Sequence, residues 1–486
     1  MVRTILAPSK PIKVFFARQS RPEEYREQGD ERLINAYAEM MGDGRDARMR
    51  VRMSPGLTAF STSSDDIGCR GAILSGDYLY VVFDSGAYKI DSAGARTAIG
   101  HISGTGPVTM ALNKVGQIGV VNKLGRYYVI DTATDTIQQV NTSDIGEFNS
   151  ICFIGQRFAL TLPDGSFYIT EPNDALSING LNQADAEGSP DGLVGGTELG
   201  NELYLLGTDT IEVWADTGAP PPGTPFARQG SSWINKGCRG IQTVVHADNT
   251  IFWIDKDWKV LRNDSYRGER VSHEGVERDI KRAFANGLEV RGGSYSIDGH
   301  DFIVYSCADF TWALDLKERR WHERKSKNLN RWKADVFVNA FGKWLVGTID
   351  DGNLYEIDMD TTLEGSDLMV TIARSVFMGE APDRANIYSA EIDFITGRAS
   401  LTGTVPQTNP RWELRYSDDG GAEWTNPRQL ELGTQGQYSY RCIATRLGRT
   451  GSKAGRIWEL SGSDPHPRSF RKMMLYTKPL YQRRSA

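Results

Sequence analysis

The sequence has few of the residues that commonly build metal sites or disulfide frameworks. Its 486 residues include 6 His and 5 Cys, and no CxxC pair occurs among them. An odd number of widely separated cysteines suits neither a disulfide scaffold nor a structural zinc site. We therefore predict reduced, mostly buried thiols in a protein that folds in a cytoplasm. They are Cys69, Cys152, Cys238, Cys307 and Cys442.

Long apolar runs are also missing. No window approaches the stretch of about 18 apolar residues that a membrane-spanning helix needs. The opening residues, MVRTILAPSKPIKVFFAR, place charges too close together for the apolar centre of a secretory signal. We expect a soluble chain without a membrane anchor or an export signal.

The net charge of −6 is unevenly divided. Residues 405–486 carry 14 Lys and Arg against 7 Asp and Glu, so this end has a charge of +7 and the remainder −13. The acidic remainder does not suit a protein that grips nucleic acid, for which a basic surface is expected. A basic end on an acidic body predicts a docking surface, with a solvated basic tail as the alternative.

Motifs for catalysis and metal binding are absent or incomplete. The sequence contains no G-x-S-x-G and no G-x-x-x-x-G-K-[ST] motif. His273 and His322 are each followed by Glu, as in a zinc-protease helix, but neither has a second His four residues later. The aspartates around Asp350 and Asp358 lack the glycine of a calcium loop and indicate turns. We predict no catalytic, cofactor-binding or metal-binding residue, no cofactor and no enzymatic activity.

What the sequence does contain is a repeated hairpin. DYLYVVFDSGAYKID, residues 77–91, alternates apolar and polar residues on both sides of an Asp-Ser-Gly turn. Six similar units follow, and the ends of the second strands lie 39 to 54 residues apart. A hairpin repeat of this length is typical of β-propeller blades, and we predict six or seven of them. These strand ends are Asp91, Asp131, Thr170, Trp214, Leu261, Asp315 and Asp358.

Two segments interrupt the repeat. GAPPPGTPF, residues 218–226, predicts a projecting loop because proline lacks the N–H group that a sheet requires. HEGVERDIKRAFANG places Val276, Ile280 and Phe284 four residues apart, which predicts a short helix that ends at Gly287. Core packing explains that apolar stripe better than a binding site does.

The periodic units stop near residue 365. LMVTIARSVFMG, NIYSAEIDFITG and QYSYRCIA are alternating strands, which favour a separate β-sandwich-like platform. The first 60 residues do not resemble a blade, and we expect them to pack on that platform. The sequence therefore predicts an all-β chain with an N-terminal segment at 1–60, a propeller at 61–365 and the platform at 366–486.

Within the platform, RYSDDGGAEWTNPRQLELG predicts a hairpin with a distinctive turn. Ser417, Asp419, Gly421 and Trp424 follow the pattern S-x-D-x-G-x-x-W, which resembles the Asp box of sialidases and other β-propeller proteins. Asp419 can accept backbone hydrogen bonds, and the two glycines permit positive φ angles. We interpret the turn as structural. A glycosidase needs a pair of carboxylates, and 62 acidic residues leave such a pair open without indicating it.

Several longer segments carry a resemblance to a known family. They are RLINAYAEMM and MSPGLTAF near the start, PDGLVGGTELGNELYLLGTDTIEVWADTG and PFARQGSSWINKGCRGIQTVV in the middle, and RYSDDGGAEWTNPRQLELGTQGQYSYRCIATRLG near the end. In this order, over roughly the whole chain, they resemble the tail hub, or nozzle, family of short-tailed bacteriophages. The same family is known as the packaged-DNA stabilisation proteins.

The resemblance implies a structural protein of the virion tail, made in the host cytoplasm. It implies a homo-hexameric ring below the portal and its adaptor, which extends the channel for double-stranded DNA. Such a ring helps to retain the packaged genome until ejection and anchors tailspikes or tail fibres, with a tail tip or needle protein as a further partner. A glycan-active, sialidase-like propeller enzyme and a propeller scaffold for other proteins are the alternatives.

Overall fold

The structure is a computed structural model that divides into two compact units. It describes residues 11–22, 30–42, 48–63, 68–186, 188, 191–219, 224–376, 385–450, 456–466 and 468–479. Unit 1 comprises Met1–Thr58, Phe310–Arg331 and Asp358–Ala486, and unit 2 comprises Ala59–Asp309 and Trp332–Ile357. The domain boundaries predicted after residues 60 and 365 stay a prediction.

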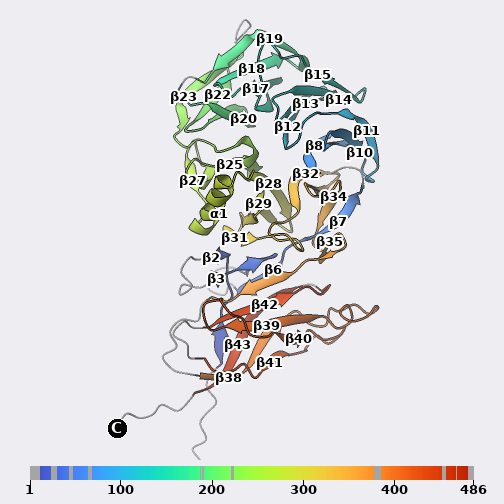
Figure 1. Cartoon of the computed structure of the whole chain (residues 1–486), viewed down its shortest axis with the longest axis vertical. Helices are drawn as coiled ribbons and strands as arrows, with labels where there is room; N and C mark the ends of the chain where they lie inside the picture. Colours follow the sequence, from blue (N-terminus) through green and yellow to red (C-terminus); the bar gives the residue numbers. More distant parts are fainter. Residues whose placement is uncertain are drawn as a thin grey trace, which may run out of the picture. The chain divides into compact units, whose positions relative to one another are not determined.

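Unit 2 is built from small antiparallel sheets that follow one another along the chain (Figure 1). Five have four strands. The first two consist of β8 (Cys69–Ser75), β9 (Tyr78–Phe83), β10 (Gly86–Ile90) and β11 (Arg96–His101), then β12 (Val108–Leu112), β13 (Gln117–Asn122), β14 (Tyr127–Asp131) and β15 (Thr136–Gln139). The third consists of β16 (Ser150–Ile154), β17 (Arg157–Thr161), β18 (Ser166–Glu171) and β19 (Asp174–Asp185).

The remaining sheets of the unit continue the same order. The fourth and fifth consist of β20 (Leu193–Leu199), β21 (Glu202–Gly207), β22 (Ile211–Asp216) and β23 (Phe226–Ile234), then β24 (Val245–Ala247), β25 (Thr250–Ile254), β26 (Val260–Asn263) and β27 (Gly268–Arg270). Within the unit, a hairpin of β28 (Arg291–Ile297) and β29 (His300–Cys307) and a meander of β32 (Ala334–Ala340), β33 (Lys343–Thr348) and β34 (Leu354–Asp358) complete the set. The described part of unit 2 thus holds seven sheets, the higher of the two predicted numbers.

The sheets of unit 2 close into a ring through buried side chains. Each packs on its neighbour, as where the rings of Phe167 and Trp214 meet with centroids 5.2 Å apart. The last meander packs on the first sheet, since Leu345 and Leu354 belong to one buried cluster with Cys69. Gly347 permits this contact, because an added Cβ would overlap the Cys69 sulfur. The propeller fold predicted from the hairpin repeat is confirmed.

The predicted local elements of unit 2 are also present. The hairpin first identified at residues 77–91 is formed by β9 and β10, and Asp84 in its turn has φ +42°. The predicted helix is α1 (Glu274–Ala285), in which Val276 and Ile280 are buried, and Gly287 follows it at φ +70°. The predicted loop at 218–226 joins β22 to β23, although residues 220–223 lie outside the described part of the chain.

Most strands of unit 1 form two facing sheets; in addition, β2 (Arg21–Pro22) pairs with β3 (Asp30–Glu31), and β35 (Leu363–Glu364) pairs with β36 (Asp367–Leu368). One has the order β41 (Cys442–Thr445), β38 (Ala385–Phe394), β43 (Ser469–Pro479), β6 (Arg48–Met53) and β5 (Ala36–Met41), and β1 (Ile12–Val14) also pairs with β43. The other, within this unit, has the order β30 (Phe310–Asp315), β31 (Arg320–Glu323), β4 (Leu33–Ile34), β37 (Thr371–Arg374), β42 (Ile457–Gly462), β39 (Arg411–Ser417) and β40 (Arg428–Glu431).

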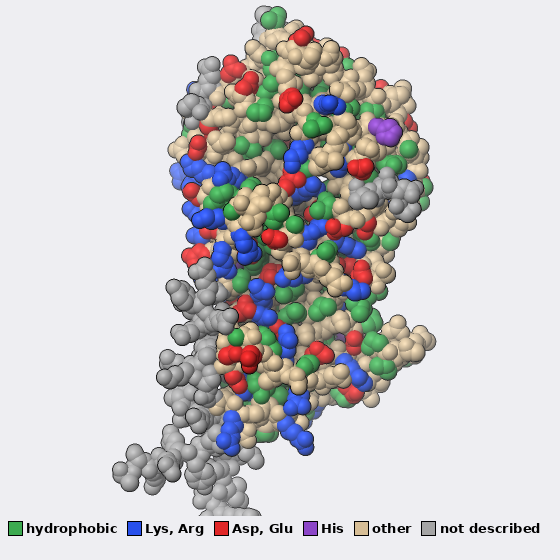
Figure 2. Space-filling view, in the orientation of Figure 1, with side chains coloured by type: hydrophobic (Ala, Val, Ile, Leu, Met, Phe, Trp, Pro, Cys, Tyr) green, Lys and Arg blue, Asp and Glu red, His purple; other side chains and the backbone are tan. Residues whose placement is uncertain are grey.

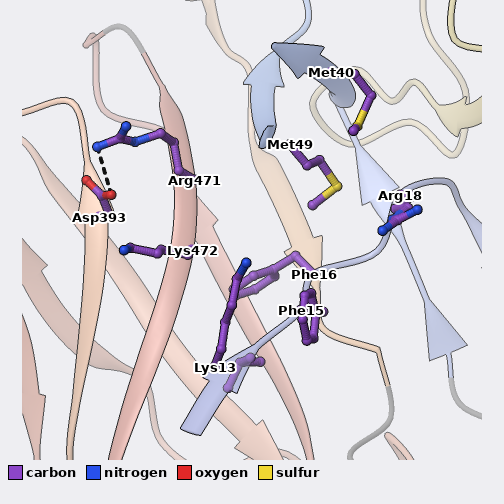
Figure 3. A pocket seen from close by; sticks show the side chains of 10 residues that line it. Lys13, Phe15, Phe16, Arg18, Met40, Met49, Asp393, Arg471 and Lys472 are labelled. Atoms are coloured by element: carbon purple, nitrogen blue, oxygen red, sulfur yellow. Dashed lines mark ion pairs between the residues drawn. The ribbon is translucent and has the colours of Figure 1, made fainter. Parts of the chain in front are cut away.

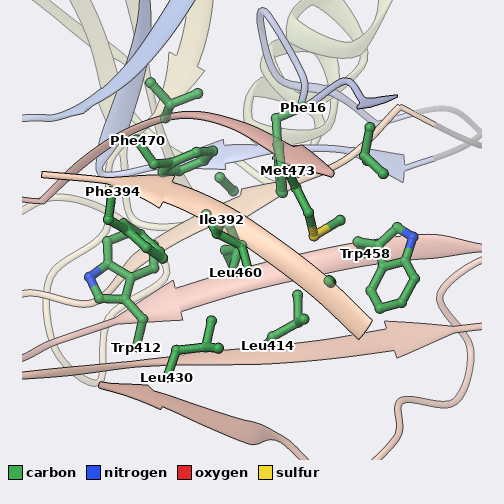
Figure 4. Packing of buried hydrophobic residues seen from close by; sticks show 14 of the residues in the cluster. Phe16, Ile392, Phe394, Trp412, Leu414, Leu430, Trp458, Leu460, Phe470 and Met473 are labelled. Carbon is green, nitrogen blue, oxygen red and sulfur yellow. The ribbon is translucent and has the colours of Figure 1, made fainter. Parts of the chain in front are cut away.

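Aromatic side chains from both sheets interdigitate between them (Figure 4). The Trp412 ring lies 5.0 Å from that of Phe394 and 5.9 Å from that of Phe470, each from the opposite sheet. Burying one such side chain contributes roughly 1.5–3 kcal/mol, so this layer holds the sheets together. The predicted β-sandwich is confirmed, and strands from both ends of the chain build it.

Candidate functional site

A groove on unit 1 begins where β1 runs along β43. Val14 lies opposite Met473 in this antiparallel pair, and the strand alternates between the core and the surface. Val14 and Phe16 are each 2% exposed, whereas Phe15 between them is 55% exposed. The period of two in KVFF therefore anchors the segment through two side chains and presents the aromatic ring of the third at the surface.

The groove beside Phe15 has a volume of 470 Å³ (Figure 3). Met40 and Met49, which lie opposite each other in β5 and β6, are half-buried in its wall. Methionine side chains adapt to irregular partners because they are unbranched and polarisable. The full lining consists of Lys13, Val14, Phe15, Phe16, Arg18, Met40, Met49, Asp393, Arg471 and Lys472.

Positive charge predominates in this groove. Asp393 is its one carboxylate, and it pairs with Arg471 at 2.9 Å between side-chain oxygen and nitrogen. The Lys13 ammonium lies 4.9 Å from the centroid of the Phe15 ring. In the described part of the chain, no carboxylate is within ion-pair distance of Lys13, Arg18 or Lys472. An acidic partner with an apolar side chain would complement both the charge and the exposed ring.

The charge on unit 2 is distributed differently. On the face shown in Figure 2, acidic and basic side chains are interspersed. The ion pairs of this unit include Arg270 with Glu277 at 2.6 Å and Arg262 with Asp248 at 2.7 Å. The groove on unit 1 therefore differs from this face in carrying an excess of one sign.

The turn between β39 and β40 keeps its polar groups occupied. Asp419 accepts hydrogen bonds from the backbone N–H groups of Ala422 at 2.9 Å and Glu423 at 3.0 Å. The Ser417 hydroxyl donates to Asp419 at 2.6 Å and accepts from the Gly421 N–H at 2.8 Å. These bonds, that from Glu423 first, hold the pKa of Asp419 below its usual range. The carboxylate is committed to the fold of the turn, as the sequence predicts.

The tryptophan of this turn packs on charged neighbours. Its indole Nε1 donates to the Gly421 carbonyl at 3.1 Å. The guanidinium groups of Arg374 and Arg415 each lie 4.9 Å from the centroid of the Trp424 ring. Both arginines also pair with the fully buried Glu459. The turn is thus fastened to the neighbouring strands β37 and β42.

The histidines that the sequence analysis considered occupy structural positions. His273 caps α1, with its Nδ1 accepting a hydrogen bond from the Gly275 N–H at 3.1 Å. His322 is buried in the strand β31, so His322 and Glu323 do not form the helical motif of a zinc protease. Among the described residues, no group of three or more His, Cys, Asp or Glu side chains could hold a metal ion.

The structure also shows the role of Asp358 and tests the expected absence of a membrane-spanning helix. Asp358 accepts a hydrogen bond from the Asp360 N–H at 2.8 Å, as expected of a turn. Within the described ranges, no helix is long and apolar enough to cross a membrane.

The sequence reasoning did not identify the groove residues Lys13, Phe15 and Lys472. The alternation in KVFFAR and RKMMLY could have indicated exposed aromatic and basic side chains there.

Two family models match the chain in succession. The model described as "Bacteriophage P22 Gp10, beta-propeller" matches residues 17–362. The model described as "Bacteriophage P22 Gp10, beta-sandwich" matches residues 374–474. The propeller model thus matches first along the chain and the sandwich model second, and the structure contains both folds. None of the curated proteins matches the sequence.

Solved structures resemble part of the chain at low identity. BamB from Moraxella catarrhalis is 11% identical and covers 65% of this chain and 92% of its own, with a TM-score of 0.39. The structure of U3-55K is 11% identical, covers 63% of this chain and 99% of its own, and has a TM-score of 0.41. The WD40 repeats of RRP9 are 10% identical with the same coverage and TM-score.

Proposed function

The chain belongs to the bacteriophage P22 Gp10 family of tail hub proteins, and we propose that it assembles as a six-fold ring below the portal and its adaptor. As a member of this family it is a structural component of the virion tail. The observation that carries the proposal is the succession of matches over residues 17–362 and 374–474, which include both folds of the family. A ring of copies related by a closed rotation leaves a central channel.

The proposed ring extends the DNA channel and helps to retain the packaged genome until ejection. The chain outside residues 405–486 has a net charge of −13. A wall with this sign of charge repels phosphate and lets DNA slide, whereas a basic wall would hold it by releasing counterions. The proposed role is therefore mechanical and electrostatic and requires no catalytic residue.

The proposed partners are the portal adaptor, the tailspikes or fibres and a tail tip or needle protein. The groove around Phe15 supports a docking role for unit 1, because it combines an exposed aromatic ring with four exposed basic side chains, of which Arg471 alone has an ion-pair partner among the described residues. Aromatic side chains that enter a partner's pocket supply much of the energy of protein interfaces. We propose that strands from residues 1–60 and 366–486 carry most of the contacts with neighbouring subunits and the adaptor.

Virions assembled without this chain provide the test. If the chain is the hub, DNA-filled heads should form without a complete tail and should lose their DNA on storage. Adding the purified chain should restore both tail assembly and DNA retention. Particles that keep their DNA and complete their tails without the chain would contradict the proposal, whereas loss of tailspikes alone would limit the role to anchoring.

A further inference from the structure

The ring of sheets in unit 2 surrounds a hollow on its axis. Residues from six of the seven sheets line it, most of them from the first strand of a sheet, and its volume is 550 Å³. Its wall includes Leu74 from β8, Met110 from β12, Phe153 from β16 and Ile241 beside β24. These apolar side chains leave room for a small molecule with an aliphatic body.

Glu198 is the one acidic or basic side chain in this wall apart from His246. It lies on β20, and within the described residues no Lys or Arg comes within ion-pair distance of its carboxylate. Burial raises the pKa of Glu198, and its carboxyl group lies against the buried Cys152 thiol. A carboxylate that is partly removed from water without a counter-ion gains from a bound cation.

His246 is not a positively charged counter-ion for Glu198. Its Nε2 and the Thr197 hydroxyl oxygen are 2.8 Å apart, which occupies one ring nitrogen in a hydrogen bond. Burial lowers the pKa of His246, so the ring is neutral near neutral pH. The Gln242 side chain adds an amide oxygen that can accept a further hydrogen bond. The polar part of the hollow therefore offers acceptors and one uncompensated negative charge.

We propose that this hollow binds a small primary alkylammonium ion. Its ammonium group pairs with the Glu198 carboxylate, and its alkyl chain lies against Met110, Phe153 and Ile241. An ammonium group has three donors and no acceptor, which matches the acceptors around Glu198. The site is separate from the groove on unit 1, and it does not depend on the proposed role in the tail.

Titration of the full chain with n-butylammonium at about pH 8 tests the proposal. Binding is followed by calorimetry and by the methyl NMR signal of Met110 in protein labelled at the methionine methyl groups. We expect saturable binding and a shift of the Met110 signal, and no comparable shift with n-butanol, which has a similar shape and no charge. Glu198→Gln keeps the size of the side chain and should weaken binding at least about tenfold, the value of one charge-assisted hydrogen bond.

The control is Glu269→Gln, since Glu269 is exposed on β27 and does not line the hollow. It should bind n-butylammonium as the parent does. Circular dichroism, together with methionine methyl signals that match those of the parent chain, shows whether Glu198→Gln is folded. If Glu198→Gln does not fold, displacement of n-butylammonium by n-butanol at equal concentration decides the question. No saturable binding, equal affinity of folded Glu198→Gln, or equal binding of the alcohol would each overturn the proposal.

Discussion

The guanidinium Nε of Arg324 donates a hydrogen bond to Oδ1 of Asn35 at 3.2 Å, and both residues are almost completely buried in unit 1. The Asn35 amide nitrogen in turn donates to the carbonyls of Lys325 at 2.7 Å and Val370 at 2.8 Å. Arg324 also donates to the Pro55 carbonyl at 2.9 Å. These two side chains therefore join three segments that are far apart in the sequence.

Replacing Asn35 should destabilise unit 1. Asn35→Ala removes the donor to two part-buried carbonyls and one acceptor of the buried Arg324 guanidinium, for which we expect a loss of about 3 kcal/mol in the free energy of unfolding. Urea unfolding followed by tryptophan fluorescence measures it. Asn386→Ala, on the exposed side of β38, is the matched control and should change stability by less than about 0.5 kcal/mol. Equal effects of the two variants would contradict the assigned role.

The turn at residues 417–424 should stabilise the fold in a pH-dependent way. Its hydrogen bonds lower the pKa of Asp419 in the folded chain below the ordinary value of 3.8. The resulting stabilisation is fully present above that value and is lost as the pH falls toward the folded pKa. Asp419→Ala should therefore lower the melting temperature at neutral pH, and the difference from the parent should shrink near about pH 3.

Calorimetry at both pH values measures this difference, with Glu413→Ala on the same hairpin as the control, because that side chain is exposed. A difference of the same size at both pH values would show that the carboxylate does not act through its ionised form.

All five cysteine side chains are buried, so they should react slowly in the folded chain. Burial raises the pKa of Cys69 to about 12, that of Cys442 to about 12 and that of Cys238 to about 11. The thiolate is the reactive form, and little of it is present near pH 8. We expect labelling by an aromatic disulfide reagent at least about 100-fold slower than in urea. A thiol that reacts at the unfolded rate would contradict its burial.

Changes in the groove should affect assembly more than folding. Phe15 is 55% exposed, so Phe15→Ser should leave the melting temperature nearly unchanged. If the ring enters a partner's pocket, incorporation of the chain into tails should fall at least about tenfold, as for other aromatic residues at the centre of interfaces. Quantitative mass spectrometry of purified particles measures the occupancy.

Leu401→Ser is the control for this variant, because Leu401 is 82% exposed in the same unit and lies outside the groove. Lys472→Glu tests the contribution of charge, with Arg428→Glu on the exposed side of β40 as its counterpart. Full occupancy of both groove variants would exclude the groove from the assembly interface.

Local features of this fold could be predicted from the sequence because their signals are local. A few neighbouring residues suffice to predict the turn at Asp84 and the positive φ of Gly421. The same holds for the apolar stripe of the helix at Val276 and Ile280. The number of sheets was less certain, since their hairpins repeat at unequal intervals.

Contacts between distant segments could not be predicted in the same way. Asn35 and Arg324 are separated by 289 positions, and neither residue type indicates a buried hydrogen bond by itself. The groove likewise combines Phe15 with Lys472, and only the pairing of β1 with β43 brings them together. The hollow beside Glu198 depends on the closure of a whole ring of sheets. Such sites require the three-dimensional fold.

The central claim is that this chain forms the hub ring of a phage tail. Electron cryo-microscopy of the purified virions, at a resolution that shows side chains, tests it most directly. We predict six copies around the DNA channel directly below the adaptor, each with a propeller and a β-sandwich, and density from a partner over Phe15. A tail map in which this position is occupied by a different chain, or in which this chain is absent, would contradict the account.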